Sequence, residues 1–521
     1  MRAGYARRAC LLLKFALLST VLRVGYFTMA PHPDSTVLSM LKISALPFPL
    51  LLSLLLSMPA WSQESLPLTV AAALQKAGIA ASGLSVVLMP ASGGAPVFTQ
   101  FADRAMSPAS TMKLLTTQIG LDELGPGFRW KTQILGESAV KKEVLSGNLY
   151  LRGGGDPNLT WDKLGIMLRK LRQQGLRKID GDIVLDRHYF QPIRPDIMAA
   201  PFDETPEAYY NVVPDALLIH SNITSFALES DASKVIIHLM TPLDKIKIVS
   251  RLQLSDKACG EWEKGWLPPT IRTTLFHQIE ITLNGSFPRN CQKTTHLNLL
   301  ERNQYISHML RLLWQEMGGS WYGEVVDGST PLTATLLIER QSEPLADTLR
   351  IINKFSDNSM ARMLYLSLGA ESVVAKNYAD HFLAADARVR NWFAQQGMSD
   401  TGLVLENGSG LSRTERISAQ QLAGVLQAAT RSNWYPEFAS SLPIVAVDGT
   451  MRKRLNGSIN PGSARIKTGT LKDALSVAGY VRDINGASWI VVGIINSEGL
   501  DKGKGRVALD ELIAWVAAGR P

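Results

Sequence analysis

The chain has 521 residues, of which 46% are hydrophobic and 19% are charged, and its formal net charge is +8. A single hydrophobic core normally stops growing well below this length, so we expect at least two domains. Residues 1–62 hold six Lys or Arg against one acid, which leaves the rest near +3 without a long basic run, and this excludes nucleic acid as an expected partner.

The N-terminal region predicts export. Residues 48–58 (FPLLLSLLLSM) follow Lys42 and precede Ala60-Trp61-Ser62. A basic residue, a short apolar run and small residues in this order indicate a secretory signal peptide over residues 1–62, with cleavage after Ser62. We therefore expect the mature protein in the periplasm.

A second apolar stretch, residues 11–24, precedes this signal and is broken by Lys14 and Arg23. It has no role ahead of a complete signal peptide. We interpret it as a mis-assigned N-terminal extension, with translation beginning at Met29 or Met40.

Cysteine usage agrees with an oxidising compartment. Of the three cysteines, Cys10 lies in the segment expected to be removed, which leaves Cys259 and Cys291. An even pair in an exported protein favours a disulfide. Two reduced, buried thiols are the alternative.

The first elements after the signal are a hairpin and a helix. Residues 84–88 and 96–100 are apolar runs separated by a Ser-Gly-Gly turn, which predicts two paired strands. Ser107 as N-cap and Pro108 at the first helical position then predict a helix that carries Ser110 and Lys113 on one face.

Residues 130–338 read differently, as short strands broken by Gly, Pro and Asn, with helices at 164–171 and 305–317. Further on, helices are predicted at 345–354 and 360–368, strands at 464–470, 475–482 and 489–496, and a closing helix at 508–517.

This order predicts a multi-domain α/β (α+β) chain. Residues 63–128 and 340–521 would form one catalytic domain from two segments, and residues 129–339 would be an inserted, mostly β block. About 240 residues separate Ser110 from Ser356, far more than a loop can hold, so a folded insert is required.

Three short patterns carry the expected chemistry: Ser110-Thr111-Met112-Lys113, Ser356-Asp357-Asn358 and Lys467-Thr468-Gly469. Together they match the pattern of penicillin-binding proteins and class A β-lactamases. A serine hydroxyl needs an adjacent base, and a lysine can serve when burial or a neighbouring cation lowers its pKa. Spacing i, i+3 on a helix brings the two side chains together.

Each pattern alone is weak. Ser-x-x-Lys also occurs at Ser39 to Lys42 and at Ser138 to Lys141, but only Ser110 begins a predicted helix. Lys-Ser/Thr-Gly occurs once, on a predicted strand. The ordered set of three is what favours a catalytic site.

Other candidates favour plain structure. The segments 407–410 (Asn-Gly-Ser-Gly) and 448–450 (Asp-Gly-Thr) have turn composition, and 153–157 (Gly-Gly-Gly-Asp-Pro) indicates a bend, since no Lys-Ser/Thr follows as a phosphate loop requires. No His-Glu-x-x-His or paired metal spacing occurs among the eight histidines, and no Gly-x-Ser-x-Gly elbow is present. No cofactor or metal is expected.

At this level of detail the chain resembles the class C low-molecular-mass penicillin-binding proteins, the D-Ala-D-Ala carboxypeptidase and endopeptidase family. The segments that carry the resemblance span the mature chain: SPASTMK, KFSDNSMARML, ENGSGLSR, LPIVAVDGTMRKR, KTGTLKDALSVAGY, and GGGDPNLT with the Cys259 to Cys291 pair in the insert.

The resemblance implies a mechanism. Ser110 would attack the carbonyl between two D-alanines, Lys113 would take its proton, and Ser356 would relay a proton to the leaving amine. The backbone N–H groups of Ser110 and Thr470 would form the oxyanion hole. The resemblance also implies a set of substrate-binding residues: Asn358, Lys467, Thr468, Gly469 and Thr470.

It further implies the partners: peptidoglycan as substrate, β-lactams as covalent inhibitors, and neither a nucleic acid nor a cofactor. A homodimer and peripheral association with a membrane are left open. Two other functions are weighed: a β-lactamase-type hydrolase, for which no acidic deacylation residue can be placed, and a catalytically silent wall-binding protein, against which the intact Ser110, Lys113 and Lys467 argue.

Overall fold

The computed structural model describes residues 65–274, 278–373 and 378–519, so the predicted signal peptide and start-site extension lie outside the described residues. Within these ranges, none of the helices is both long enough and apolar enough to span a bilayer.

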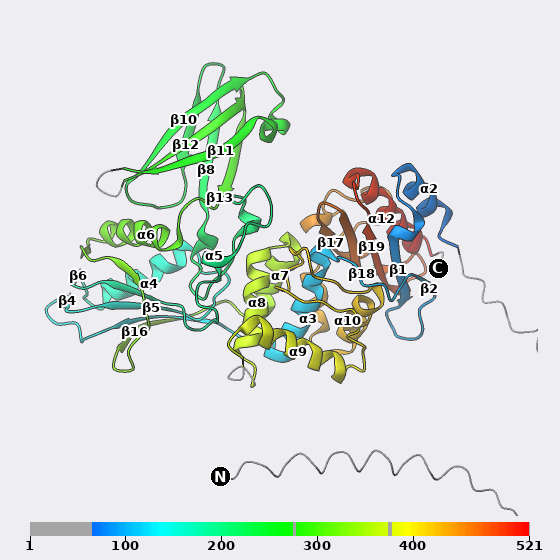
Figure 1. Cartoon of the computed structure of the whole chain (residues 1–521), viewed down its shortest axis with the longest axis horizontal. Helices are drawn as coiled ribbons and strands as arrows, with labels where there is room; N and C mark the ends of the chain where they lie inside the picture. The colour runs from blue at the N-terminus through cyan, green and yellow to red at the C-terminus, as the bar shows by residue number, and fades with distance from the viewer. Residues whose placement is uncertain (1–64, 275–277, 374–377, 520–521) are drawn as a thin grey trace, which may run out of the picture. The chain divides into compact units, whose positions relative to one another are not determined.

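An antiparallel five-stranded sheet joins the two ends of the described chain (Figure 1). Its strand order is β17-β18-β19-β1-β2. The strands are β1 (Leu84–Pro90), β2 (Phe98–Gln100), β17 (Ala464–Thr470), β18 (Ala474–Arg482) and β19 (Ser488–Asn496). The predicted hairpin and all three predicted C-terminal strands are therefore confirmed, and β17 forms an edge of the sheet.

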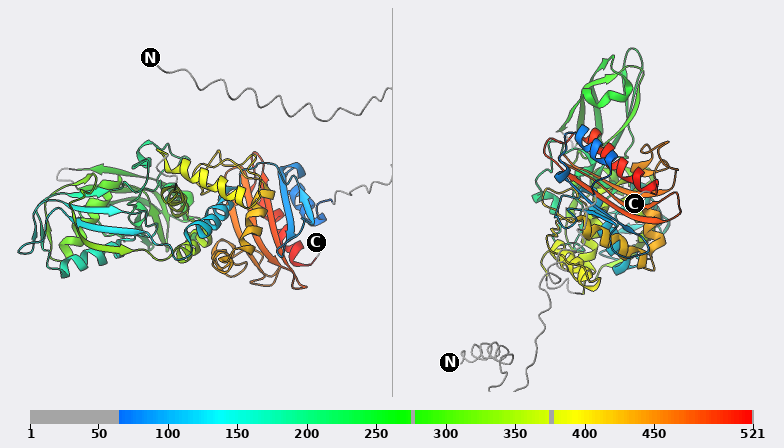
Figure 2. Two further views of the ribbon diagram at one scale, coloured as in Figure 1. Left: turned by 90° about the horizontal axis from the view of Figure 1, so that it is seen from below. Right: turned by 90° about the vertical axis from the view of Figure 1, so that its right-hand side faces the viewer.

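Helices cover both faces of this sheet. Helices α2 (Leu68–Lys76) and α12 (Lys502–Ala517) lie side by side on one face, as Figure 2 shows. On the other face, α10 packs against β1, β18 and β19 within a group of helices that share one core. The group consists of α3 (Met112–Leu124), α7 (Leu345–Phe355), α8 (Asn358–Ala370), α9 (His381–Gln395), α10 (Ala419–Arg431) and α11 (Tyr435–Ser441).

Buried side chains explain the two layers. Strand β18 is buried at eight successive positions, as expected for a strand covered on both faces. Helix α7 instead buries one side only, including Leu345, Leu349 and Ile352. The resulting helical core contains α3 and α8, which carry Lys113 and Asn358 of the first two predicted patterns.

The segment between α3 and α7 is mostly β, as predicted. One five-stranded sheet has the order β15-β7-β5-β3-β16, and three three-stranded sheets have the orders β14-β6-β4, β13-β8-β9 and β10-β12-β11. The strands of the larger sheet are β3 (Lys131–Gly136), β5 (Leu149–Gly153), β7 (Ile183–Asp186), β15 (Val325–Asp327) and β16 (Thr335–Gln341). Those of the smaller sheets are β4 (Val144–Leu145), β6 (Lys178–Ile179), β8 (Thr224–Ser230), β9 (Val235–Leu239), β10 (Ile246–Ser255), β11 (Trp266–Thr273), β12 (Ile279–Pro288), β13 (Gln292–Leu297) and β14 (Ser320–Trp321).

Three helices accompany these sheets: α4 (Trp161–Gln173), α5 (Pro195–Met198) and α6 (Arg302–Glu316). Helices α4 and α6 share a hydrophobic core with the surrounding strands. This core is distinct from the two cores that lie against the sheet β17-β18-β19-β1-β2. The exact domain boundaries at 128/129 and 339/340 stay a prediction.

Cys259 and Cys291 form a disulfide, with an S–S distance of 2.00 Å and a Cα–Cα distance of 5.4 Å. The bond joins the 3₁₀ segment Cys259–Gly265 to the start of β13, and Cys291 is buried. The sequence-based pairing is confirmed, and the alternative of two reduced thiols is not what the structure shows.

We expect the disulfide to stabilise the insert. It closes a segment in which the two cysteines are 32 residues apart, so its loss should lower the free energy of unfolding by about 2 to 4 kcal/mol. Urea unfolding of a Cys259→Ser/Cys291→Ser variant, compared with wild type under reducing and oxidising conditions, measures this. An unaltered transition in the variant would contradict the expectation.

Candidate active site

Ser110 lies where the chain enters helix α3. A 3₁₀ turn, Ala109–Thr111, precedes the helix, and Lys113 occupies its first turn. Ala109 has φ +47°, a left-handed conformation that is rare for a residue with a Cβ. Ser110 follows Ala109 within the 3₁₀ turn, and Lys113 lies three residues further on in the first turn of α3.

The predicted N-cap role of Ser107 is wrong. Its N–H donates to Asn496 Oδ1 at 2.8 Å, and its carbonyl accepts from Asn496 Nδ2 at 3.0 Å. Ser107 thus ties the entry of the helix to the end of β19 instead of capping the helix, and the structure begins α3 at Met112 after the 3₁₀ turn.

The Lys113 side chain is fully buried and makes three hydrogen bonds. Its Nζ donates to Ser110 Oγ at 3.0 Å, to Asn358 Oδ1 at 2.6 Å and to the carbonyl of Ser409. Burial lowers the pKa of Lys113 to about 7, although the negative charges of Asp357 and Glu415 act in the opposite direction. A large share of this amine is therefore neutral at pH 7 and can accept a proton.

The Ser356-Asp357-Asn358 tripeptide links α7 to α8, as predicted. Ser356 caps α7 in a left-handed conformation with φ +62°. The Asp357 carboxylate caps α8 by accepting from Met360 N at 2.8 Å. These two caps fix the loop between the helices. Asn358 is the first residue of α8, and its side-chain oxygen Oδ1 accepts the hydrogen bond from Lys113 Nζ.

Lys467 is the second buried amine. It lies on edge strand β17 and donates to Ser356 Oγ at 2.8 Å and to Thr468 O at 2.8 Å. Burial, together with the charge of Lys113, holds the pKa of Lys467 well below its usual range. Each of the two serine hydroxyls therefore contacts its own buried lysine.

A glycine is needed at position 469 because the strand passes close to the 3₁₀ turn. A Cβ on Gly469 would collide with Ser476 Oγ and lie only 2.7 Å from Pro108 O. Ser476 Oγ donates to the same Pro108 carbonyl at 2.5 Å. The glycine thus lets β17 approach the segment that carries Ser110.

Two segments that the sequence favoured as plain turns contribute to the site. The Asn407 to Gly410 loop places the Ser409 carbonyl on Lys113, and the 3₁₀ turn Gly449–Met451 places Thr450 Oγ1 at 2.9 Å from Thr468 Oγ1. Both are turns, so the prediction is right about their conformation but misses their place in the site. A glycine-rich composition predicts that the chain bends there. It does not predict that the Ser409 carbonyl at this bend accepts a hydrogen bond from Lys113.

Glu415 holds the first of these loops in place. Its buried carboxylate accepts from the backbone N–H groups of Asn407 at 2.9 Å, Gly408 at 2.7 Å and Gly410 at 2.8 Å. Burial raises its pKa, while these backbone donors favour the charged form. No local sequence signal marks a glutamate that organises a loop at this distance.

The insert also reaches the site. The Tyr210 carbonyl accepts from Asn358 Nδ2 at 3.1 Å, so both ends of the Asn358 amide are occupied by the protein. Asn358 was expected to orient substrate. Its side chain joins Lys113 to the Tyr210 carbonyl and also lines the cleft, and its role in orienting substrate stays a prediction.

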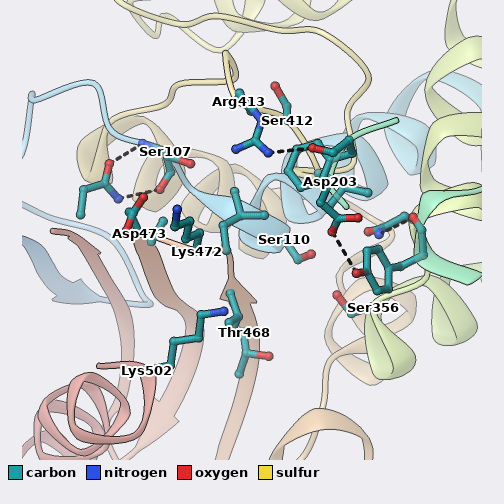
Figure 3. A pocket seen from close by; sticks show the side chains of 18 of the residues that line it. Ser107, Ser110, Asp203, Ser356, Ser412, Arg413, Thr468, Lys472, Asp473 and Lys502 are labelled. Carbon is teal, nitrogen blue, oxygen red and sulfur yellow. Dashed lines mark hydrogen bonds between the residues drawn. The ribbon is translucent and has the colours of Figure 1, made fainter. Parts of the chain in front are cut away.

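Ser110 and Ser356 open onto a cleft of about 1010 Å³. Figure 3 shows Ser110, Ser356 and Thr468 facing one space, with Asp203 and Arg413 along one side and Lys472 and Lys502 along another. Thr470 also lines the cleft, at the end of the edge strand. The structure thus brings the three predicted patterns together at one cleft, although Lys113, Lys467 and Gly469 lie beneath its surface.

Among the residues that the structure describes, no group of three or more His, Cys, Asp or Glu side chains could hold a metal ion.

Comparison with known proteins gives a family match over nearly the whole described chain. The model of the D-Ala-D-Ala carboxypeptidase 3 (S13) family matches residues 66–518. A D-alanyl-D-alanine carboxypeptidase of Actinomadura sp. (strain R39) is 26% identical over 76% of this chain and 74% of its own length. A second relative, D-alanyl-D-alanine carboxypeptidase DacB of Haemophilus influenzae, is 28% identical over 75% of this chain and 80% of its own length.

A solved structure shows the same fold. The crystal structure of penicillin binding protein 4 (dacB) from Haemophilus influenzae superposes with a TM-score of 0.70 at 23% identity, covering 86% of this chain and 99% of that chain. A second structure of that protein, complexed with a β-lactam, gives a TM-score of 0.66. The predicted combination of a β-lactamase-like domain and a large insert is confirmed at the level of fold.

The Glu415 contacts generate a prediction. Glu415→Gln keeps the size of the side chain but turns one acceptor into a donor facing backbone N–H groups, which should cost about 1 to 3 kcal/mol of stability. The Ser409 carbonyl should then hold Lys113 less well, and acylation by labelled penicillin should slow at least tenfold. Thermal unfolding and single-turnover acylation measure the two effects.

Glu324→Gln is the matched control, because this exposed glutamate lies in the insert away from the cleft. Wild-type acylation by a folded Glu415→Gln variant would show that the loop does not depend on this carboxylate.

Proposed function

Because the chain belongs to the D-Ala-D-Ala carboxypeptidase 3 (S13) family, we propose that it is a serine DD-peptidase that cleaves D-Ala-D-Ala in peptidoglycan stem peptides, and also stem cross-links. One observation carries the proposal. A buried amine with a pKa of about 7, Lys113, lies 3.0 Å from the hydroxyl of Ser110 at the floor of an open cleft.

Acylation begins with Ser110. Its oxygen attacks the carbonyl carbon between the two D-alanines while its proton passes to neutral Lys113. Asn358 Oδ1 and the Ser409 carbonyl accept hydrogen bonds from Lys113 Nζ. These two bonds orient the amine toward Ser110 and favour its protonated form. Two backbone N–H groups, those of Ser110 and Thr470, would bind the oxyanion, and such a donor is commonly worth about 3 to 4 kcal/mol of barrier.

The second step releases D-alanine. The C–N bond breaks as Ser356 hands its proton to the leaving nitrogen. The proton that Lys113 took from Ser110 then returns to Ser356 through Lys467, its partner at 2.8 Å, so the site ends the step with no proton gained or lost. Water then attacks the Ser110 ester and frees the shortened stem peptide. With two buried amines the site can hold and return the proton without a metal or cofactor.

Substrate would bind along the exposed edge of β17. An extended peptide can pair with the backbone at Thr468 to Thr470, as peptides do at open sheet edges. Thr468 Oγ1, with Lys467 beneath it and Thr450 beside it, suits the terminal carboxylate of the substrate. These binding roles belong to the proposal.

The cellular setting is proposed on the same basis. Export by the signal peptide would place the enzyme in the periplasm with its peptidoglycan substrate, and β-lactams would acylate Ser110 as substrate mimics. Residues 63–128 and 340–521 would act as the catalytic domain and 129–339 as an insert that completes the site through Tyr210. A homodimer and membrane association stay predictions.

Labelled penicillin tests the nucleophile. It should acylate the wild type and not Ser110→Ala, and Ser138→Ala is the matched control because Ser138 begins a second Ser-x-x-Lys in an exposed turn. Labelling of a folded Ser110→Ala variant would overturn the assignment. Rapid penicillin turnover by the wild type, in place of a long-lived adduct, would favour the β-lactamase alternative.

The pKa of Lys113 predicts the pH dependence of acylation. Lys113 acts as a base only when neutral, and its neutral fraction rises through pH 7, so the acylation rate should climb about tenfold between pH 6 and pH 8 and then level off. Stopped-flow acylation over this range measures the profile. A rate that is flat or that falls with pH would remove Lys113 as the base.

Digestion of purified peptidoglycan distinguishes the two cleavage modes. Release of free D-alanine reports carboxypeptidase action, and loss of cross-linked dimers with gain of monomers reports endopeptidase action. We expect both products from the wild type and neither from Ser110→Ala. Intact peptidoglycan after treatment with a penicillin-reactive wild type would contradict the proposed substrate.

A further inference from the structure

A second cavity lies behind the Ser356 to Asn358 loop. Its volume is about 530 Å³, within the range of small-molecule sites. The insert supplies most of its lining, and α7, α8 and the loop between them supply the rest through Ile351, Asp357, Ser359 and Met360. Tyr209 lines both this cavity and the catalytic cleft, so the two spaces share a wall. The proposed reaction uses none of these lining groups to bind substrate or to move a proton.

The lining combines aromatic and apolar surface with neutral polar groups. Trp161 and Tyr209 supply aromatic rings, and Ile223 and Met240 supply aliphatic surface. Tyr209 and Met240 are exposed, at 56% and 53%, so the cavity is open to solvent on their side. The polar members are amide, hydroxyl and imidazole groups: Asn158, Thr160, His220, Ser221, Ser225, Thr241 and His296.

The cavity carries little charge. Burial lowers the pKa of both His220 and His296, which keeps the imidazoles neutral at pH 7. Asp357 is the one carboxylate in the lining, and it is already engaged in capping α8 through Met360 N. A charged ligand would therefore find no free counter-charge, whereas the catalytic cleft presents several charged side chains.

The backbone of the cavity wall is held in an unusual form. His220, Ser221 and Asn222 are three successive residues with left-handed φ values of 48°, 51° and 57°. Asn222 Nδ2 holds the turn by donating to Asn298 Oδ1 and to Leu300 O, both at 2.8 Å. Strain of this kind persists only where the surroundings impose it, and it is concentrated at binding and catalytic sites.

We propose that this cavity binds a neutral N-acetylhexosamine ring of the glycan strand that bears the stem peptides. Such a ring has an apolar face that can stack on Trp161 and an edge of hydroxyl and acetamido groups that matches the imidazole, hydroxyl and amide lining. The inference rests on the proposed function, since that function brings a glycan strand to the protein. The cleft would hold the charged peptide and the cavity the uncharged sugar.

The test uses the tetrasaccharide of β-1,4-linked N-acetylglucosamine, which contains no peptide and so offers nothing to Ser110. Titration into the full Ser110→Ala chain, followed by calorimetry and saturation-transfer NMR, should show saturable binding. Trp161→Ala should weaken it at least tenfold. Met240→Glu, which adds a charge at an exposed position of the cavity, should do the same without touching the core.

Tyr322→Ala is the matched control, because Tyr322 is an aromatic residue of the insert that is 84% exposed and does not line the cavity. It should bind the tetrasaccharide as the parent does. Maltotetraose, which lacks the acetamido groups, should bind at least tenfold more weakly than the N-acetylated sugar.

Absence of saturable binding would overturn the inference, as would equal binding by maltotetraose or unaltered binding by Met240→Glu. If Trp161→Ala fails to fold, Met240→Glu still decides. Penicillin labelling of the wild type is read separately, so failure of the sugar site and failure of the peptidase assignment give different results.

Discussion

The site depends on burying the amine of Lys113 without leaving it unpaired. Moving an ammonium group out of water costs several kcal/mol, and the protein offsets part of this cost with acceptors from Ser110, Asn358 and Ser409. These acceptors come from three distant parts of the chain. Their convergence ties the helical core, the loop between α7 and α8 and the glycine-rich loop into one unit. Burial within this unit lowers the pKa of Lys113 to about 7, which suits a base near neutral pH.

Lys467 repeats the arrangement at the second serine, and the two amines influence one another. Each amine discourages full protonation of its neighbour, because two positive charges in one dry region repel. A proton taken up at Ser110 can thus leave by way of Ser356 without a stable doubly charged state. This provides a physical reason for two Ser–Lys pairs in place of one.

The sequence predicts much of this fold, because its signals are local. Alternating and helical hydrophobic patterns located the hairpin, the strands around Lys467 and helices α7 and α8. The helix start was misjudged because Pro108 and Ser107 have ideal capping composition, whereas a long-range bond to Asn496 decides what Ser107 does. Thr450 and Tyr210 were missed for the same reason, because each acts through a contact with a residue far away in sequence. Glu415 contacts backbone N–H groups only five to eight residues away, but composition does not show that its carboxylate turns inward to hold that loop.

The bond from Asn358 to the Tyr210 carbonyl bears on how this architecture could have arisen or been altered. A block of chain added to an existing enzyme can usually be trimmed back, since a loop takes its place. Here a chain without Tyr210 would leave the buried Asn358 amide without the carbonyl that accepts its hydrogen bond. Leaving this donor unpaired should cost about 1 to 3 kcal/mol of folding free energy, next to the proposed reacting groups. The segment between α3 and α7 therefore supplies one wall of the proposed site, and a shortened chain would need another acceptor at that place.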